Sequence, residues 1–131
     1  MLLYTHLLFS LMIALITGLN PVLMIIGALL PDIDNPESII GQLFKKVSEK
    51  IYEKYNHRGL THSILFIMPL MIIPSLGIGA LTHILLDLMT KSGVQLMYPN
   101  KTRYILFGGS LITGTHDMIA SIACIMVMVL C

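Results

Sequence analysis

Residues 1–30 read MLLYTHLLFSLMIALITGLNPVLMIIGALL, and this stretch decides the fold class that the sequence predicts. Its first 19 residues are almost wholly apolar, and a helix needs about 20 such residues to cross a bilayer. Asn20 and Pro21 interrupt the segment, and proline suits the first turn of a new helix. We therefore expect a first membrane helix and a short second one, which ends at Pro31.

The composition of the whole chain points the same way. Of its 131 residues, 56% are hydrophobic and only 11% are charged, whereas soluble domains carry about 25% charged residues. Eight Lys and Arg residues nearly balance seven Asp and Glu residues, which argues against a nucleic-acid-binding basic patch and against an acidic disordered tail. The length suits one domain, so we expect a single integral-membrane domain over residues 1–131.

Residues 37–55 have a different, amphipathic pattern. Apolar side chains recur at helical spacing at Ile40, Phe44, Val47, Ile51 and Tyr55, and lysine and glutamate occupy the other face. This pattern predicts a helix that lies on the membrane surface or against the helix bundle.

The remaining apolar segments predict further membrane helices. We expect a helical hairpin over residues 60–73 and 76–90, turning at Pro74-Ser75, and a last helix over residues 115–130. A small β-hairpin is predicted at residues 103–113 (RYILFGGSLIT). The expected fold is thus an all-α, polytopic membrane bundle of about five apolar helices plus one amphipathic surface helix.

Charge is distributed unevenly along this expected topology. If the apolar segments alternate across the membrane, every charged residue and all five histidines fall on the side of the N-terminus. Because Lys and Arg favour the cytoplasmic side, we expect a multi-pass protein of the cytoplasmic (inner) membrane with its N-terminus and its polar cluster facing the cytoplasm.

Histidine and aspartate form the candidate site. His83 and Asp87 are four residues apart, on one helical face, where they can hold a metal ion or simply hydrogen-bond to each other. The expected topology brings further candidates to the same side, and these are His6, Asp32, Asp34, His57 and His62. Imidazole and carboxylate are ligands of zinc and of harder divalent ions. Such an ion lowers the pKa of bound water towards neutrality, and this number of ligands would allow one or two ions.

The segment Asn56-His57-Arg58-Gly59-Leu60-Thr61-His62-Ser63 leaves alternatives open. His57 and His62 lie about 140° apart on a regular helix, so only one can point inward from it. We favour His62 as the ligand, while His57 is placed to support a ligand, to face substrate or to lie exposed. Arg58 is suited either to an anionic substrate oxygen or to a lipid phosphate.

Several of these segments resemble a known family. TH near the N-terminus, GALLPDIDNP, HRGLTHS and HILLDLMTKSGVQLMYP resemble the motifs of LexA-regulated, membrane-bound metal-dependent hydrolases of the YdjM type, over residues 5 to about 99. That family is distantly similar to zinc-dependent phospholipase C and to fungal zinc nucleases. The resemblance implies that Asp32, His62, His83 and Asp87 bind zinc, and that Asp87 bridges to a second ion held with His6.

The expected function is a membrane-embedded hydrolase that uses metal-activated water on a phosphoester or lipid-type substrate at the cytoplasmic face. Metal ligands would be His6, Asp32, His62, His83 and Asp87, and catalytic residues would be Asp34 (orienting water), His57 and Arg58. The alternative is a non-enzymatic membrane protein with a His/Asp pathway for cations or protons, although such a pathway should place polar groups at several depths. A purely structural role for the His-Asp pairs is a third possibility, and it predicts no metal.

Overall fold

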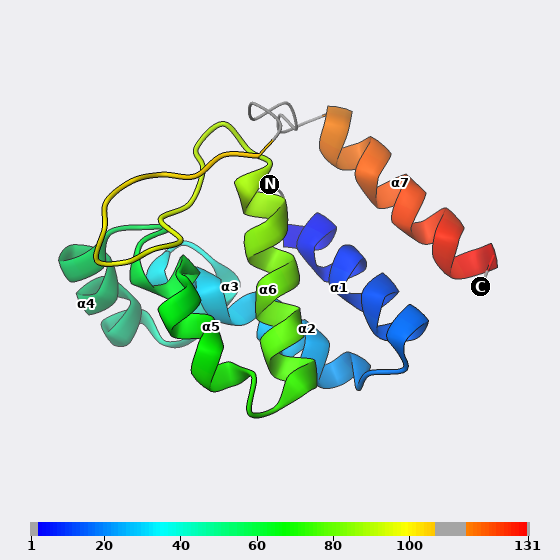
Figure 1. Cartoon of the computed structure of the whole chain (residues 1–131), viewed down its shortest axis with the longest axis horizontal. Coiled ribbons are helices and arrows are strands. Elements are labelled where there is room, and N and C mark those ends of the chain that lie inside the picture. The colour runs from blue at the N-terminus through cyan, green and yellow to red at the C-terminus, as the bar shows by residue number, and fades with distance from the viewer. Residues whose placement is uncertain (1–2, 107–114, 131) are drawn as a thin grey trace.

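The computed structural model describes residues 3–106 and 115–130, and its regular structure is helical (Figure 1). In chain order the elements are α1 (Leu3–Thr17), α2 (Pro21–Leu29), the 3-10 helix η1 (Leu30–Asp34), α3 (Ile39–Leu43), α4 (Lys45–Tyr55), the 3-10 helix η2 (Leu60–His62), α5 (Ile64–Leu70), α6 (Pro74–Leu88) and α7 (Thr115–Leu130). Helices α4 and α7 lie at opposite ends of the long axis, and α7 packs against α1.

Several predicted boundaries are confirmed. Helix α2 begins at Pro21, and the side chain of Asn20 caps it by accepting a hydrogen bond from the Leu23 N–H. The expected helical hairpin exists as α5 and α6, but it turns at residues 71–73 and not at Pro74-Ser75, because Pro74 lies in the first turn of α6. Proline fits there because the first turn has no helical acceptor for its missing N–H.

The single amphipathic helix predicted for residues 37–55 is wrong. The chain bends at Phe44, whose φ of −115° and ψ of 43° are not helical, and the segment forms the two helices α3 and α4. The bend allows both short helices to pack against η1. It also leaves Phe44 49% and Val47 50% exposed, so this part of the apolar stripe is not buried against the bundle.

The predicted β-hairpin is only partly within the described residues. Tyr104 pairs with Val94 in an isolated antiparallel bridge, and no strand occurs in residues 3–106. The rest of that prediction, residues 107–113, lies outside the described residues. The bridge belongs to an irregular segment that returns across η2 and α5, where the Gln95 N–H donates to the Arg58 carbonyl.

The prediction of a polytopic bundle is also wrong. Within the described residues, no helix combines the length and the apolar character needed to cross a membrane. The longest is α7 with 16 residues, followed by α1 and α6 with 15 each. Sixteen residues rise about 24 Å, against about 30 Å of bilayer hydrocarbon.

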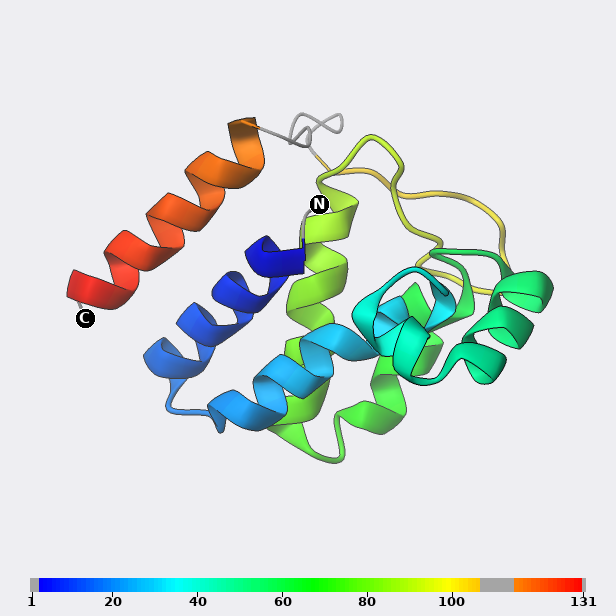
Figure 2. The same cartoon turned by 180° about the vertical axis from the view of Figure 1, so that it is seen from behind.

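Helices α2 and α6 make the most extensive contact between helices in the described residues, and the view from behind shows them crossing (Figure 2). Glycine makes this approach possible. A Cβ at Gly27 would lie 2.1 Å from the Leu76 carbonyl oxygen, and one at Gly79 would lie 2.2 Å from the Met24 carbonyl oxygen. Neither position can hold a larger residue without moving the backbone of the facing helix.

The interior is unusually polar for so hydrophobic a chain. A small apolar cluster of Ile67, Ile84, Leu88 and Val94 packs between α5 and α6. Most other buried side chains are polar, and those in or next to the candidate site are His6, Asp34, Thr61, His62, His83, Asp87 and Thr90. Among the described residues, the helices therefore bury more polar side chains than large apolar ones.

Candidate metal centre

All five predicted metal ligands meet at one place in the fold. His6 comes from α1, Asp32 from η1, His62 from η2, and His83 and Asp87 from α6. The three imidazoles and Asp87 are at most 2% exposed, whereas the side chain of Asp32 is 19% exposed and gives the cluster its opening to solvent.

The distances within the cluster suit a bound cation. Nε2 of His62 lies 3.4 Å from Oδ2 of Asp87 and 4.0 Å from Oδ1 of Asp32. Nε2 of His83 lies 3.5 Å from Oδ1 of Asp32 and 3.6 Å from Oδ2 of Asp87. Two ligand atoms about 2.1 Å from one ion at a tetrahedral angle are about 3.4 Å apart. These side chains therefore fit a divalent ion in both donor type and spacing.

A second possible ligand group overlaps the first. It contains His6, His83 and Asp87, and its donor atoms lie within 4.8 Å of one another. Because His83 belongs to both groups and one imidazole nitrogen binds one ion, the geometry supports one ion directly. Asp87 has a second carboxylate oxygen, Oδ1, which lies 3.7 Å from Nε2 of His6, but this oxygen also accepts a hydrogen bond from Arg58 at 2.8 Å, so a second ion there would compete with Arg58.

Hydrogen bonds on the outer side of the rings hold the two central imidazoles in place. Nδ1 of His83 donates to the Ala28 carbonyl oxygen at 2.6 Å, and Nδ1 of His62 lies 3.1 Å from Oδ2 of Asp34. With Nδ1 as the donor, the neutral ring turns the lone pair of Nε2 towards the cluster. Both Nε2 atoms are buried without a hydrogen-bond partner among the described residues. A buried polar atom in that state costs about 1–3 kcal/mol.

Asp34 lies behind His62 and does not face the ligating atoms. Its carboxylate is fully buried and accepts hydrogen bonds from Nδ1 of His57 at 2.7 Å, from the Arg58 N–H at 2.9 Å, and from the Thr61 hydroxyl. With the contact to His62, both carboxylate oxygens are engaged. Asp34 therefore contacts His57 and His62 and does not face the ligating atoms, and its predicted role in orienting water stays a prediction.

Arg58 is committed to Asp87. Its guanidinium donates to Oδ1 of Asp87 at 2.8 Å and to the Thr90 hydroxyl at 2.9 Å. The backbone of Arg58 has a φ of 63°, a left-handed conformation that is uncommon for residues other than glycine. Sequence reasoning missed the contact of Thr90 with Arg58, although its position three residues after Asp87, within the helix expected over residues 76–90, was a usable signal.

The electrostatics of the cluster favour bound positive charge. Burial alone would lower the pKa of His83, but the nearby carboxylates of Asp32 and Asp87 raise it to about 10. Burial opposes ionisation of Asp87 as well, yet His62 and His83 hold its pKa well below the usual range. The pKa of His6, by contrast, falls to about 3 because the ring is buried and lies beside His83. Without metal, a proton on His83 supplies positive charge to the cluster.

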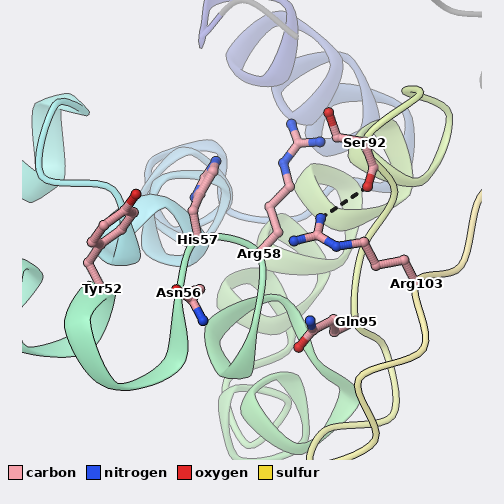
Figure 3. A pocket seen from close by; sticks show the side chains of 7 residues that line it. All are labelled: Tyr52, Asn56, His57, Arg58, Ser92, Gln95 and Arg103. Atoms are coloured by element: carbon pink, nitrogen blue, oxygen red, sulfur yellow. Dashed lines mark hydrogen bonds between the residues drawn. The ribbon is translucent and has the colours of Figure 1, made fainter.

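A polar pocket of about 490 Å³ lies beside the cluster (Figure 3). His57 and Arg58 line it and also bond to Asp34 and Asp87, so these two residues connect the pocket with the cluster. Arg103, on the opposite wall, was missed by sequence reasoning, which assigned residues 103–113 to a β-hairpin and noted no binding motif there.

The model of the family described as YdjM inner membrane protein matches residues 1–78, more than half of the chain and including His6, Asp32 and His62. The chain belongs to the YdjM inner membrane protein family. It is 36% identical to "Inner membrane protein YdjM" of Escherichia coli (strain K12), over 77% of this chain and 67% of that protein. It is also 36% identical to "Uncharacterized protein YvsG" of Bacillus subtilis (strain 168), over 66% of this chain and 63% of that protein.

No solved structure matches this YdjM-family chain. The resemblance to YdjM-type proteins is thus confirmed by sequence. The names of the relatives state no activity, so zinc binding, hydrolysis and the similarity to phospholipase C stay predictions.

Proposed function

We propose that this YdjM-family protein is a metal-dependent hydrolase of a phosphoester, with one or two divalent ions, most suitably zinc, bound by His6, Asp32, His62, His83 and Asp87. One observation carries the proposal. The buried Nε2 atoms of His62 and His83 have no hydrogen-bond partner among the described residues, and they face two carboxylates at 3.4 to 4.0 Å.

The residues around the ligands have separate tasks in this proposal. A divalent ion bound there supplies Lewis acidity and lowers the pKa of a bound water. Asp34 holds His62 and His57 in orientation, and Arg58 balances the charge of Asp87. His57 is half-buried at the pocket with Nδ1 on Asp34, a position from which it can exchange a proton with a substrate oxygen.

Metal analysis of detergent-purified protein tests the proposal. The wild type should retain about one or two divalent ions per chain, and His83→Ala should lose metal. Thr82→Ala is the matched control, because Thr82 is buried on the same helix but its hydroxyl donates to the Gly79 carbonyl oxygen. Hydrolysis of phosphodiesters and phospholipids should then depend on metal and stop on addition of a chelator. A folded His83→Ala protein with stoichiometric zinc would overturn the ligand assignment, and a wild type that takes up no metal would favour a structural role.

We further propose that the protein associates with the inner membrane, the location printed in the names of its relatives. Large apolar side chains are exposed on α5 and α7, among them Leu65, Met68, Ile122 and Val129. The exposed lysines of α4 suit the anionic cytoplasmic leaflet, so we place the candidate site on the cytoplasmic side. A membrane-impermeant thiol label on Lys46→Cys, in a chain with its native cysteines replaced by serine, should react only after the cells are permeabilised.

A further inference from the structure

The polar pocket is lined by positively charged side chains, and the proposed metal chemistry does not explain all of them. Its walls come from α4 at Tyr52, from residues 56–58, and from the irregular segment at Ser92, Gln95 and Arg103. Every one of these side chains is polar, and none is a carboxylate. Two guanidinium groups therefore line a pocket that contains no acidic side chain.

The two arginines are held differently. Arg58 is 11% exposed and paired with Asp87. Arg103 is exposed, and its guanidinium donates to the backbone carbonyls of Ser92, at 3.0 Å, and of Gly93, at 3.5 Å. Figure 3 shows its side chain extending towards the loop that carries His57 and Arg58. Carbonyl oxygens fix the position of a guanidinium without neutralising it, so, with no carboxylate of the described residues paired with it, Arg103 brings positive charge to the pocket.

The size and the donors of the pocket indicate what it can bind. At about 490 Å³ it is larger than an inorganic anion and falls in the range of small-molecule sites. The amide side chains of Asn56 and Gln95 and the hydroxyls of Tyr52 and Ser92 add hydrogen-bond donors to the arginines. Planar guanidinium groups bind phosphate oxygens with paired, charge-assisted hydrogen bonds.

We propose that this pocket binds a phosphate group carried by the substrate, and that Arg103 is its specificity-determining residue. Because Arg58 touches both Asp87 and the pocket, the bound group lies one side chain away from the candidate metal ligands. The link to hydrolysis rests on the function proposed above, whereas binding of the phosphate group does not. A phospholipid headgroup and a water-soluble phosphate ester present the same chemistry to this pocket.

Binding to metal-stripped protein separates the pocket from the metal centre. Glycerol 3-phosphate serves as the soluble probe in calorimetric titrations of detergent-purified protein, and vesicles with and without phosphatidic acid serve as the lipid probe. With at least one of these probes, Arg103→Gln should weaken binding by about tenfold or more, because it removes a charge-assisted hydrogen bond. Lys101→Gln is the matched control, since Lys101 is an exposed cation two residues earlier that does not line the pocket, and it should change binding by less than about twofold.

The outcomes are distinct. A loss with Arg103→Gln on the soluble probe identifies a soluble phosphate ester as the source, and a loss on phosphatidic acid vesicles alone identifies a lipid. Equal binding by wild type and Arg103→Gln, or phosphate binding that requires metal, overturns the proposal. If Arg103→Gln does not fold, Arg103→Lys keeps the charge without the planar fork and should still weaken binding severalfold. Phosphate binding without metal uptake or hydrolysis would support the pocket as a phosphate-binding site and would contradict the proposal that the protein is a metal-dependent hydrolase.

Discussion

His62 illustrates how single residues are arranged in this site. One ring nitrogen contacts Asp34 and the other faces Asp32 and Asp87, so the imidazole connects a buried carboxylate with the proposed ion. A carboxylate that hydrogen-bonds to the outer nitrogen of a metal-binding histidine fixes the orientation of the ring and raises the basicity of the nitrogen that binds the metal. The cluster therefore depends on Asp34 even though Asp34 supplies no ligating atom.

Replacing Asp34 with asparagine tests this dependence. Asp34→Asn keeps the size of the side chain but removes the charge that holds His57 and His62, and we expect metal affinity to fall by about 10- to 100-fold while the fold is retained. Competition with a zinc-binding dye measures the change. Glu37→Gln is the matched control, because it neutralises an exposed carboxylate three residues away and should leave affinity unchanged. Equal losses in both variants would contradict a specific role for Asp34.

The raised pKa of His83 predicts that metal binding releases protons. With a pKa of about 10, His83 is protonated at pH 8 in the folded, metal-free protein. A histidine with the ordinary pKa of about 6.5 would already be neutral there. A divalent ion needs the neutral ring, so binding at pH 8 should release about one proton from His83, and affinity should weaken as the pH falls. Calorimetry in two buffers of different ionisation enthalpy counts the protons, and a count of zero would contradict this assignment.

That the candidate site residues lie close together was predictable from sequence, but the contacts of Asp34 and Arg58 were not. His6, Asp32, His62, His83 and Asp87 could be chosen because imidazole and carboxylate are metal-ligating groups and all lie at the ends of apolar segments. The actual bonds of Asp34 and Arg58 depend on the loop before η2, where Asn56 and Arg58 both have positive φ. Left-handed residues other than glycine leave no reliable signal in a single sequence.

At the level of elements, helix positions were predictable because proline and asparagine mark their starts, whereas helix lengths and bends were not. Gly18, with a φ of 71°, follows the end of α1 at Thr17, so the first apolar segment is helical over fewer residues than its hydropathy suggested. The bend at Phe44 brings both α3 and α4 against η1, and the periodicity of a single segment carries no information about such contacts with another part of the chain.

The contact between α2 and α6 positions His83, and its glycines allow a test. Alanine usually stabilises a helix relative to glycine by about 0.5–1 kcal/mol, but a Cβ at Gly79 would meet the Met24 carbonyl oxygen at 2.2 Å. Gly79→Ala should therefore destabilise the protein, by about 1–3 kcal/mol. It should also weaken metal binding, because moving α2 disturbs the bond between His83 and Ala28.

Thermal unfolding and zinc competition measure both effects of Gly79→Ala. Leu81→Ala is the control, because Leu81 lies on the same helix and is 44% exposed, so it should change both quantities little. A Gly79→Ala protein as stable as the wild type would show that the two helices can separate without harm to the site.

At the scale of the whole molecule, polar side chains fill the interior and large apolar side chains cover much of the surface. Composition predicts the apolar excess but not its placement, because a hydropathy average does not distinguish a long spanning helix from a short one with an exposed face. Extended exposed apolar surfaces mark contacts with a membrane or another protein. With a family named for the inner membrane, the surface of α7 becomes the part of the fold to test.

Helix α7 should contribute strongly to membrane retention. Ile122, Ile125 and Val129 are 53%, 46% and 80% exposed, and replacing all three with serine removes apolar contact area at about 25 cal/mol per Å². Because exposed side chains contribute little to folding, the variant should fold and bind metal, yet wash off membranes at lower salt or milder alkali than the wild type. Serine at the exposed, uncharged polar positions Gln42, Asn100 and Thr102 is the matched control, because it leaves the charge of α4 unaltered, and it should leave retention unchanged. Equal retention of all three proteins would assign membrane contact to another surface, and loss of folding in the α7 variant would show that this face is covered by protein.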